Sequence, residues 1–253
     1  MIHFVLLRGL AREAAHWLDF PVRLHEALGG ACQLHLIDFP GCGTHLKAAA
    51  LTSVEAMTEH ARAELVDVLG ARHEPVLVVG ISMGGMVALD WAQRFPDEVR
   101  GLVLINSSAG DQPVWWRLRP RALPAILFAF ISGVKSREAR VLSIVSNNRA
   151  DYAQHLNQWL HIQQQRPVTR ATIATMLRAA ARFRPQAQCK VDGLLLASEQ
   201  DRMVSVRASD ALARQFGWPI HHHPQAGHDL PLDDPHWVSA KIAAWCAGGA
   251  APE

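Results

Sequence analysis

A serine between two glycines is the residue in this sequence best suited to act as a nucleophile. Ser82 lies in the segment GISMG (80–84), after the apolar run 75–79 and before the helix-like run 86–92. A sharp turn from a buried strand into a helix holds such a serine at the end of a sheet, and glycines allow the close backbone approach that the turn needs. The alternative is a glycine-rich turn with an incidental serine.

A serine becomes a nucleophile when a base takes its proton and an acid orients that base. Asp201 follows the apolar run 194–197 and is the candidate acid; Glu199 competes but lies nearer to the predicted strand. Helix capping or an ordinary loop charge is the alternative role for Asp201. His228 follows the last predicted strand, beside a glycine in a loop, and is the candidate base.

The elements that must position these residues follow from an alternation of short apolar runs and helix-like stretches. Near-continuous apolar strands between helices predict an α/β fold with a mostly parallel, doubly wound sheet covered on both faces. The predicted strands cover 2–7, 33–39, 75–81, 101–106, 193–197 and 219–223, and the predicted helices cover 55–69, 84–95, 205–216 and 237–246.

The alternation stops after the fourth strand, where residues 107–186 contain no strand-like run. Helix-like stretches at 149–165 and 170–183 predict that this segment is a helical lid, or cap, inserted into a core made of 1–106 and 187–253. Ligands bind at the carboxyl ends of strands in open sheets, so we expect the lid to cover that edge.

Five short segments resemble the α/β-hydrolase superfamily, in its serine-hydrolase, carboxylesterase-like branch. They lie in the core on both sides of the insertion, and the insertion itself shows no resemblance. The resemblance implies an α/β-hydrolase fold and a Ser82, Asp201, His228 triad that cleaves carboxylic esters through an acyl-enzyme. The five segments are LLRG (6–9), DFPGCG (38–43), GISMGG (80–85), EQD (199–201) and AGHD (226–229).

The resemblance also implies an oxyanion hole made by the backbone N–H groups of Leu10 and Met83. Arg8 stands where most relatives carry histidine, and it forms either a structural ion pair or a contact with an anionic group of the substrate. Trp115 and Trp116 in the lid are candidate substrate-binding residues. Helical spacing favours packing on the core for most of the lid's apolar residues between 115 and 131, with a membrane-surface role as the alternative.

No metal and no organic cofactor are expected, because triad chemistry needs neither. Three consecutive histidines at 221–223 do not predict a metal site, since neighbouring strand residues face opposite sides. The four cysteines form no CxxC pair and indicate free thiols of a reducing compartment. The start resembles no signal peptide and no apolar run reaches about 18 residues, so we expect a cytoplasmic protein.

Three alternatives to simple ester hydrolysis remain open. One is another triad chemistry: carbon–carbon bond hydrolysis, perhydrolysis or cyanohydrin lysis. A second is a carrier-linked acyl (thio)esterase, such as a pimeloyl-carrier methyl esterase. The third is a binding protein without catalysis, although such relatives usually lose a triad residue and all three are present here.

The net charge of +2 argues against a nucleic-acid partner, but it conceals a split. Residues 107–186 hold 12 Lys+Arg and 3 Asp+Glu, whereas the remainder holds 13 and 20. Either the basic lid docks on the acidic core, or its exposed cations recruit an acidic carrier protein or a membrane surface. A small-molecule ester is the expected substrate.

Overall fold

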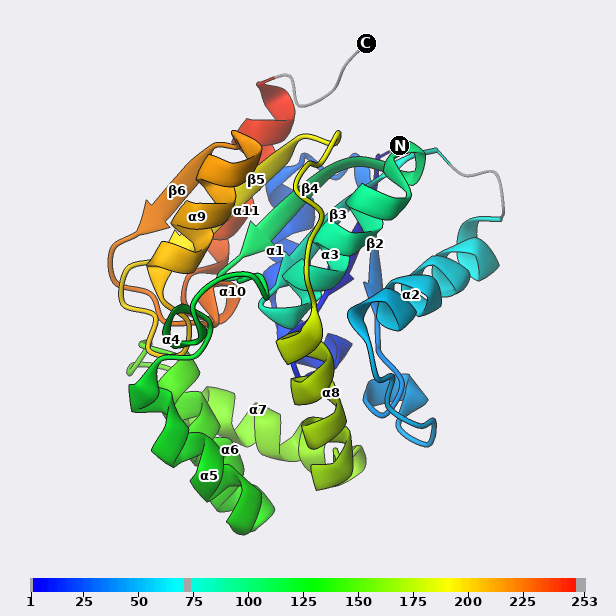
Figure 1. The fold of residues 1–253 in the computed structure, drawn as a ribbon. Coiled ribbons are helices and arrows are strands. Elements are labelled where there is room, and N and C mark those ends of the chain that lie inside the picture. Colours follow the sequence, from blue (N-terminus) through cyan, green and yellow to red (C-terminus); the bar gives the residue numbers. More distant parts are fainter. Residues whose placement is uncertain (1, 71–73, 249–253) are drawn as a thin grey trace.

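A six-stranded, wholly parallel sheet forms the centre of the computed structural model, which describes residues 2–70 and 74–248 (Figure 1). The strand order is β2-β1-β3-β4-β5-β6. The chain therefore runs from β1 to the edge strand β2, returns to the other side of β1 to form β3, and then adds β4, β5 and β6 in sequence. This confirms the predicted doubly wound sheet. The strands are β1 (Ile2–Leu7), β2 (Cys32–Ile37), β3 (Val76–Ile81), β4 (Val99–Ile105), β5 (Gly193–Ser198) and β6 (Ile220–His223).

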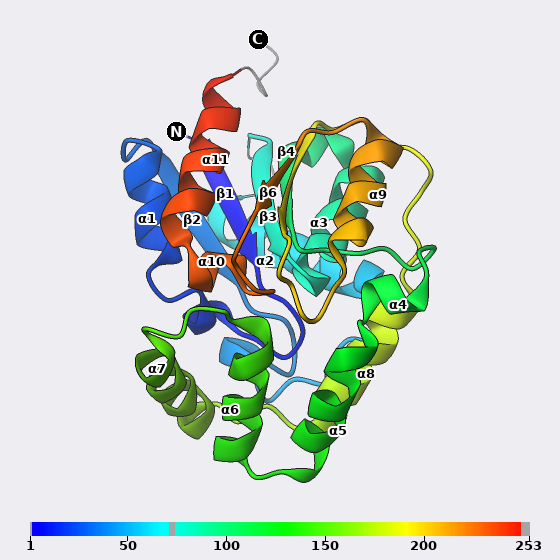
Figure 2. The ribbon, with the colours of Figure 1, turned by 90° about the vertical axis from the view of Figure 1, so that its left-hand side faces the viewer.

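Helices cover both faces of the sheet, as Figure 2 shows from the side. On one face lie α1 (Phe20–Ala27) and α11 (Pro235–Ala247), which pack against each other. On the other lie α2 (Val54–Leu69), α3 (Met83–Arg94) and α9 (Val206–Phe216). Successive side chains along a strand point to opposite faces of the sheet, so each strand contributes to both layers. In β1, Phe4 and Leu6 pack in the core on the α1 side, and Val5 and Leu7 pack in the core on the α3 side.

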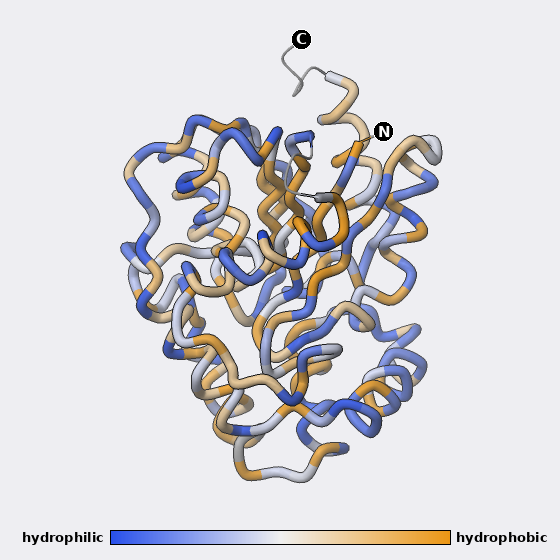
Figure 3. Tube along the Cα trace, turned by 90° about the vertical axis from the view of Figure 1, so that its right-hand side faces the viewer, coloured by the Kyte–Doolittle hydropathy of each residue, from blue (hydrophilic) through white to orange (hydrophobic). Residues whose placement is uncertain are grey.

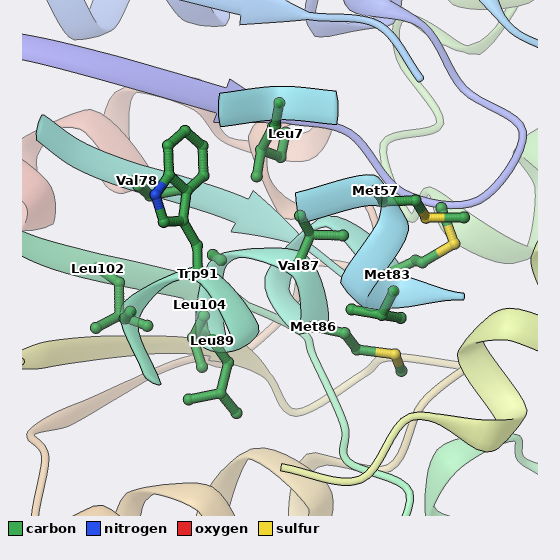
Figure 4. Packing of buried hydrophobic residues seen from close by; sticks show 14 of the residues in the cluster. Leu7, Met57, Val78, Met83, Met86, Val87, Leu89, Trp91, Leu102 and Leu104 are labelled. Carbon is green, nitrogen blue, oxygen red and sulfur yellow. The ribbon is translucent and has the colours of Figure 1, made fainter. Parts of the chain in front are cut away.

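The α3 layer is where the sheet and the predicted serine turn are joined. All six residues of β3 and ten of the twelve residues of α3 are buried. Figure 4 shows Val87 and Trp91 of α3 in the same apolar cluster as Val78 of β3 and Leu104 of β4. Burial of this much apolar surface fixes the orientation of α3 and therefore the direction of its first turn.

Five helices occupy the segment between β4 and β5. They are α4 (Val114–Arg117), α5 (Leu123–Ile131), α6 (Val134–Val145), α7 (Tyr152–Gln165) and α8 (Arg170–Arg182). Figures 1 and 2 show α5 to α8 at the end of the molecule toward which the strands run. We call residues 107–186 the insertion, and its function as a lid stays a prediction. The outermost residues of the predicted core, 1 and 249–253, lie outside the described part of the chain.

Several elements differ from the expectations. The helices α1, α5 and α6 were not predicted, and the other bounds move by up to three residues. Packing on the core is wrong for most of the apolar residues predicted to pack there between 115 and 131, because Trp115, Leu123, Leu127, Phe128 and Ile131 are exposed. The side chain of Phe130 lies outside the described residues. Within 2–70 and 74–248 no helix is long and apolar enough to cross a membrane, and all four cysteines are free.

Candidate active site

Ser82 occupies a strained turn between β3 and α3. Its φ of 55° lies in the left-handed region that a residue with a Cβ rarely adopts, and the residue is the N-cap of α3. A Cβ on Gly80 would lie 2.2 Å from the carbonyl oxygen of Gly84, and a Cβ on Gly84 would lie 2.2 Å from that of Leu7. Only glycine fits at either position, so the two glycines of the motif are needed to form the turn.

The candidate acid and base form a buried pair. Asp201 is 1% exposed and His228 is 5% exposed, and the Nδ1 of His228 lies 2.7 Å from Oδ2 of Asp201. The other oxygen, Oδ1, accepts the backbone N–H groups of Met203 and Val204 at 2.7 and 2.9 Å. A carboxylate in this role accepts, so Nδ1 of His228 is the donor and Nε2 is left as the basic nitrogen. Glu199, the competing acid, is exposed.

The surroundings of His228 raise its pKa above the ordinary value. Burial by itself lowers the pKa, but the charge of Asp201 and the hydrogen bond to it, together with the charge of Asp229, outweigh burial. The nearby cation of Arg8 acts in the opposite direction. A histidine tuned in this way is a stronger base toward a hydroxyl group.

The end of β4 connects the serine turn to the histidine loop, a feature that the sequence did not reveal. Ile105 accepts the N–H of Ser82 at 2.9 Å, and the hydroxyl of Ser107 donates to the carbonyl of Ser82 at 2.8 Å. Between them, the buried amide of Asn106 donates to the carbonyl of His228 at 2.9 Å. Three consecutive residues, 105–107, thus bind the backbone of both Ser82 and His228; we call these residues the frame at the end of β4.

The predicted oxyanion residues lie on two backbones that meet at Ser82. A Cβ built on Gly9 would lie 3.2 Å from Cβ and 3.8 Å from Oγ of Ser82, so the segment that leads into Leu10 runs directly beside the serine. Met83 is the first residue of α3, where an N–H has no acceptor within its own helix. Both N–H groups belong to segments next to the serine, which is the arrangement that the resemblance implies.

Arg8 forms an ion pair with Asp229, the first of the two alternatives for this residue. Its Nη1 and Nη2 donate to Oδ1 and Oδ2 of Asp229 at 3.1 and 2.5 Å, and both residues are 3% exposed. The guanidinium also lies over the ring of Trp17, 4.8 Å from its centroid. Because Gly9 follows Arg8 and Asp229 follows His228, the ion pair ties the oxyanion segment to the histidine loop. A role of Arg8 in substrate binding stays a prediction.

The insertion contacts the same loops. The carbonyl of Val145, at the end of α6, accepts the N–H of Asp229 at 2.7 Å. Asp233 accepts from the N–H of Gly227 at 2.6 Å and from the hydroxyl of Ser146 at 2.6 Å. On the other side, the carbonyl of Trp116 accepts the N–H of Ser205, just beyond the acid loop. The insertion is therefore built against both the acid and the base.

The two tryptophans of the insertion differ in exposure. Trp115 is 64% exposed, whereas Trp116 is partly buried next to the acid loop. Substrate binding by either residue stays a prediction.

Few of the insertion's cations pair with the core. Arg166 pairs with Glu13 of the core, and Glu138 of the insertion pairs with Arg12 of the core and with Arg137. These contacts fix the base of the insertion. Among the described residues, one of the insertion's twelve Lys and Arg residues, Arg166, pairs with a core carboxylate, so docking on an acidic core accounts for only a small part of the charge split.

A possible cation-binding cluster lies away from this site. His45, His60 and Glu64 offer ligand atoms within 4.8 Å of one another, on the loop after β2 and on α2. Sequence analysis did not predict this cluster, because His45 comes close to the other two residues only in the fold. Two histidines of β6 each contact one carboxylate: Nε2 of His222 lies 2.8 Å from Oδ1 of Asp210, and Nε2 of His223 lies 3.2 Å from Oδ2 of Asp234.

A comparison with protein families matches residues 4–241 to a family described as the alpha/beta hydrolase family. The chain belongs to this family. Among curated proteins it is similar to two pimeloyl-[acyl-carrier protein] methyl ester esterases. The protein from Nitrosomonas europaea is 30% identical over 69% of this chain and 58% of its own length, and the one from Chromobacterium violaceum is 37% identical over 34% and 31%. The chain thus spans about a third to under two thirds of these relatives.

Solved structures share the fold at low sequence identity. A thermophilic esterase from Thermogutta terrifontis has a TM-score of 0.73 at 20% identity, covering 98% of this chain and 90% of that one. An enol-lactonase from Burkholderia xenovorans has a TM-score of 0.75 at 18% identity, covering 97% and 91%. These likenesses support the alpha/beta hydrolase fold.

Proposed function

We propose that this hydrolase cleaves carboxylic esters with Ser82 as nucleophile, His228 as general base and Asp201 as the orienting acid. The observation that carries the proposal is the frame at the end of β4, which binds the strained serine turn and the loop of a buried, carboxylate-paired histidine at adjacent residues. A glycine-rich turn with an incidental serine would not require a buried His–Asp pair beside it.

In the proposed mechanism, Nε2 of His228 takes the proton of Ser82 while Oγ attacks the ester carbonyl. Asp201 stabilises the imidazolium, and the N–H groups of Leu10 and Met83 bind the oxyanion. His228 returns the proton to the leaving alkoxide, which departs as the alcohol and leaves an acyl-enzyme. Water then attacks the acyl group, again with His228 as base, and releases the acid and free Ser82.

A panel of p-nitrophenyl esters of increasing acyl length tests the proposal, with Ser82→Ala compared with the wild type. We expect loss of at least about 10³-fold in kcat, since removal of a triad member leaves only the oxyanion hole and binding. Ser136→Ala is the matched control, because Ser136 is exposed on α6. Full activity of Ser82→Ala would refute the assignment, and turnover of a vinylogous diketone in place of every ester would favour carbon–carbon hydrolysis.

A carrier-linked ester is the second candidate substrate. The curated relatives named above are esterases of an acyl-carrier protein ester, and an excess of cations on the insertion suits an acidic carrier. We expect a higher kcat/KM for a methyl ester carried by acyl-carrier protein than for the same acyl methyl ester in free form. Equal values for the two would remove this candidate and leave the ester hydrolase in place.

A further inference from the structure

Exposed apolar side chains are concentrated on one part of the insertion. Seven of the ten large hydrophobic residues that are exposed in the described part of the chain lie between residues 114 and 134. Soluble proteins rarely gather such residues on one patch without a partner. The seven are Val114 (71% exposed), Trp115 (64%), Leu123 (46%), Leu127 (66%), Phe128 (38%), Ile131 (79%) and Val134 (39%).

The helix α5 supplies the centre of this patch. Leu123, Leu127 and Ile131 are spaced four residues apart, so they lie along one face of the helix, and that face is exposed. Ala122 and Ala125 are buried on the inner side. The sequence of α5, LPAILFAFI, holds no polar residue, although part of the helix faces solvent. Among the described side chains of α5, Ala125 is buried whereas four large apolar residues are exposed, the reverse of a helix that packs on its own core.

The centre of the patch lies along one arm of a helical hairpin, and Ile131 lies next to its tip. A two-residue link, 132–133, joins α5 to α6, and the two helices pack against each other. Figure 2 shows this link at the end of the insertion farthest from both chain termini. Figure 3 shows hydrophobic colour on the tube at this end of the molecule, outside the central sheet. The exposed apolar side chains of α5 therefore lie on the part of the insertion that is farthest from both chain termini.

Cations surround the apolar face. Residues 111–151 contain seven Lys and Arg and three acids; Glu138 is 2% exposed and engaged by two arginines, and the exposed Asp111 and Asp151 lie at the two ends of the segment. Arg121, Lys135 and Arg140 are exposed, and the guanidinium of Arg140 lies over the ring of Phe128, 5.2 Å from its centroid. The patch is therefore apolar at its centre and positive at its rim.

We propose that the α5–α6 hairpin docks on an anionic lipid surface. Interfacial helices bury an apolar face into the boundary between headgroups and acyl chains, while lysine and arginine at their edges meet anionic headgroups. A second copy of the chain is disfavoured, because it would bring two positive rims together. A helix face of large exposed aliphatic side chains with basic residues beside it is the pattern of helices that lie in a lipid interface, whereas docking of an acidic protein would need mainly the cations. The binding does not rest on the proposed ester hydrolysis.

Co-sedimentation with vesicles tests this directly. We expect the wild type to bind vesicles of phosphatidylcholine with about 30% phosphatidylglycerol more tightly than vesicles of phosphatidylcholine alone, since the anionic surface attracts cations. The double variant Leu127→Ser with Ile131→Ser should weaken binding at least tenfold, because two side chains no longer bury apolar surface in the lipid. The matched control is Val22→Ser with Val68→Ser, which removes two apolar residues of similar exposure from the core (57% and 65%).

The rim is tested with Arg121→Gln and Lys135→Gln, each expected to weaken binding to the anionic vesicles about fivefold. Lys47→Gln with Arg207→Gln, two exposed cations of the core, is the control and should leave binding unchanged. Ser82→Ala should bind like the wild type, which separates lipid binding from catalysis.

Four results would overturn the proposal. The first is absence of binding to either vesicle, and the second is equal binding by the wild type and the Leu127/Ile131 variant. The third is a wild-type protein that does not bind vesicles but forms a dimer, with that dimer lost in the variant. The fourth is binding to an acidic carrier protein in place of vesicles, lost in the same variant, which would replace lipid as the occupant.

Discussion

The buried ion pair between Arg8 and Asp229 gives the sharpest stability prediction. Asp229→Asn keeps the shape of the side chain but leaves the guanidinium, 3% exposed, without its counter-charge. Removing one partner of a buried ion pair costs about 3–5 kcal/mol, because the remaining charge is desolvated without compensation. For a domain of this size that corresponds to a decrease of about 6–20 °C in Tm.

Differential scanning calorimetry with a matched exposed pair measures this effect. Arg23 and Glu26 form an ion pair whose side chains are 36% and 58% exposed, and Glu26→Gln should cost no more than about 0.5 kcal/mol. Replacing both buried partners, by Arg8→Met with Asp229→Leu, should recover part of the lost stability. A Tm of Asp229→Asn no lower than that of Glu26→Gln would refute the reasoning. The variant should also lower kcat/KM, because the pair ties the histidine loop to the oxyanion segment.

Four further predictions concern the site. Because the pKa of His228 is raised and the base must be neutral, kcat/KM should fall with decreasing pH, with an apparent pKa above the ordinary histidine value; a midpoint below that value would be inconsistent. Asp201→Asn should lower kcat by ~10⁴-fold. It should also move the acid limb of the pH–rate profile to lower pH, because burial lowers the pKa of His228 and Asp201 no longer raises it. Asn106→Ala leaves buried polar groups without partners, so urea unfolding should show a loss of about 2–4 kcal/mol, and a loss under about 1 kcal/mol would contradict the frame. Gly84→Ala, whose Cβ would meet backbone atoms, should either fail to fold or lose about 1–3 kcal/mol and most of its activity, whereas wild-type Tm and kcat would contradict the turn geometry.

The sheet was predictable because its strands are short, apolar and separated by helices of clear period. The loops after β5 and β6 then predicted the pairing of Asp201 with His228, since the carboxyl ends of parallel strands share one edge. The helix α5 could not be predicted in the same way. Its continuous apolar sequence is typical of a buried segment, and only the fold leaves one face uncovered.

The supporting residues of the site were also beyond sequence reasoning. Arg8 and Asp229 are 221 residues apart, and no local pattern marks them as partners. Asn106 is a single polar residue after a strand, a position where residues of many types occur. Its side chain forms four hydrogen bonds, and their partners belong to β5 and the histidine loop, which are distant in the sequence. Such roles come from tertiary packing and not from periodicity.

The most direct test of the central claim is covalent labelling of the serine. A fluorophosphonate probe reacts with a serine only when a base activates it, and phosphonylation displaces fluoride. We predict one adduct on the intact protein, mapped by peptide mass spectrometry to Ser82, abolished in Ser82→Ala and strongly slowed in His228→Ala. No adduct on the folded wild-type protein, or an adduct that persists in Ser82→Ala, would contradict the assignment of Ser82 as the nucleophile.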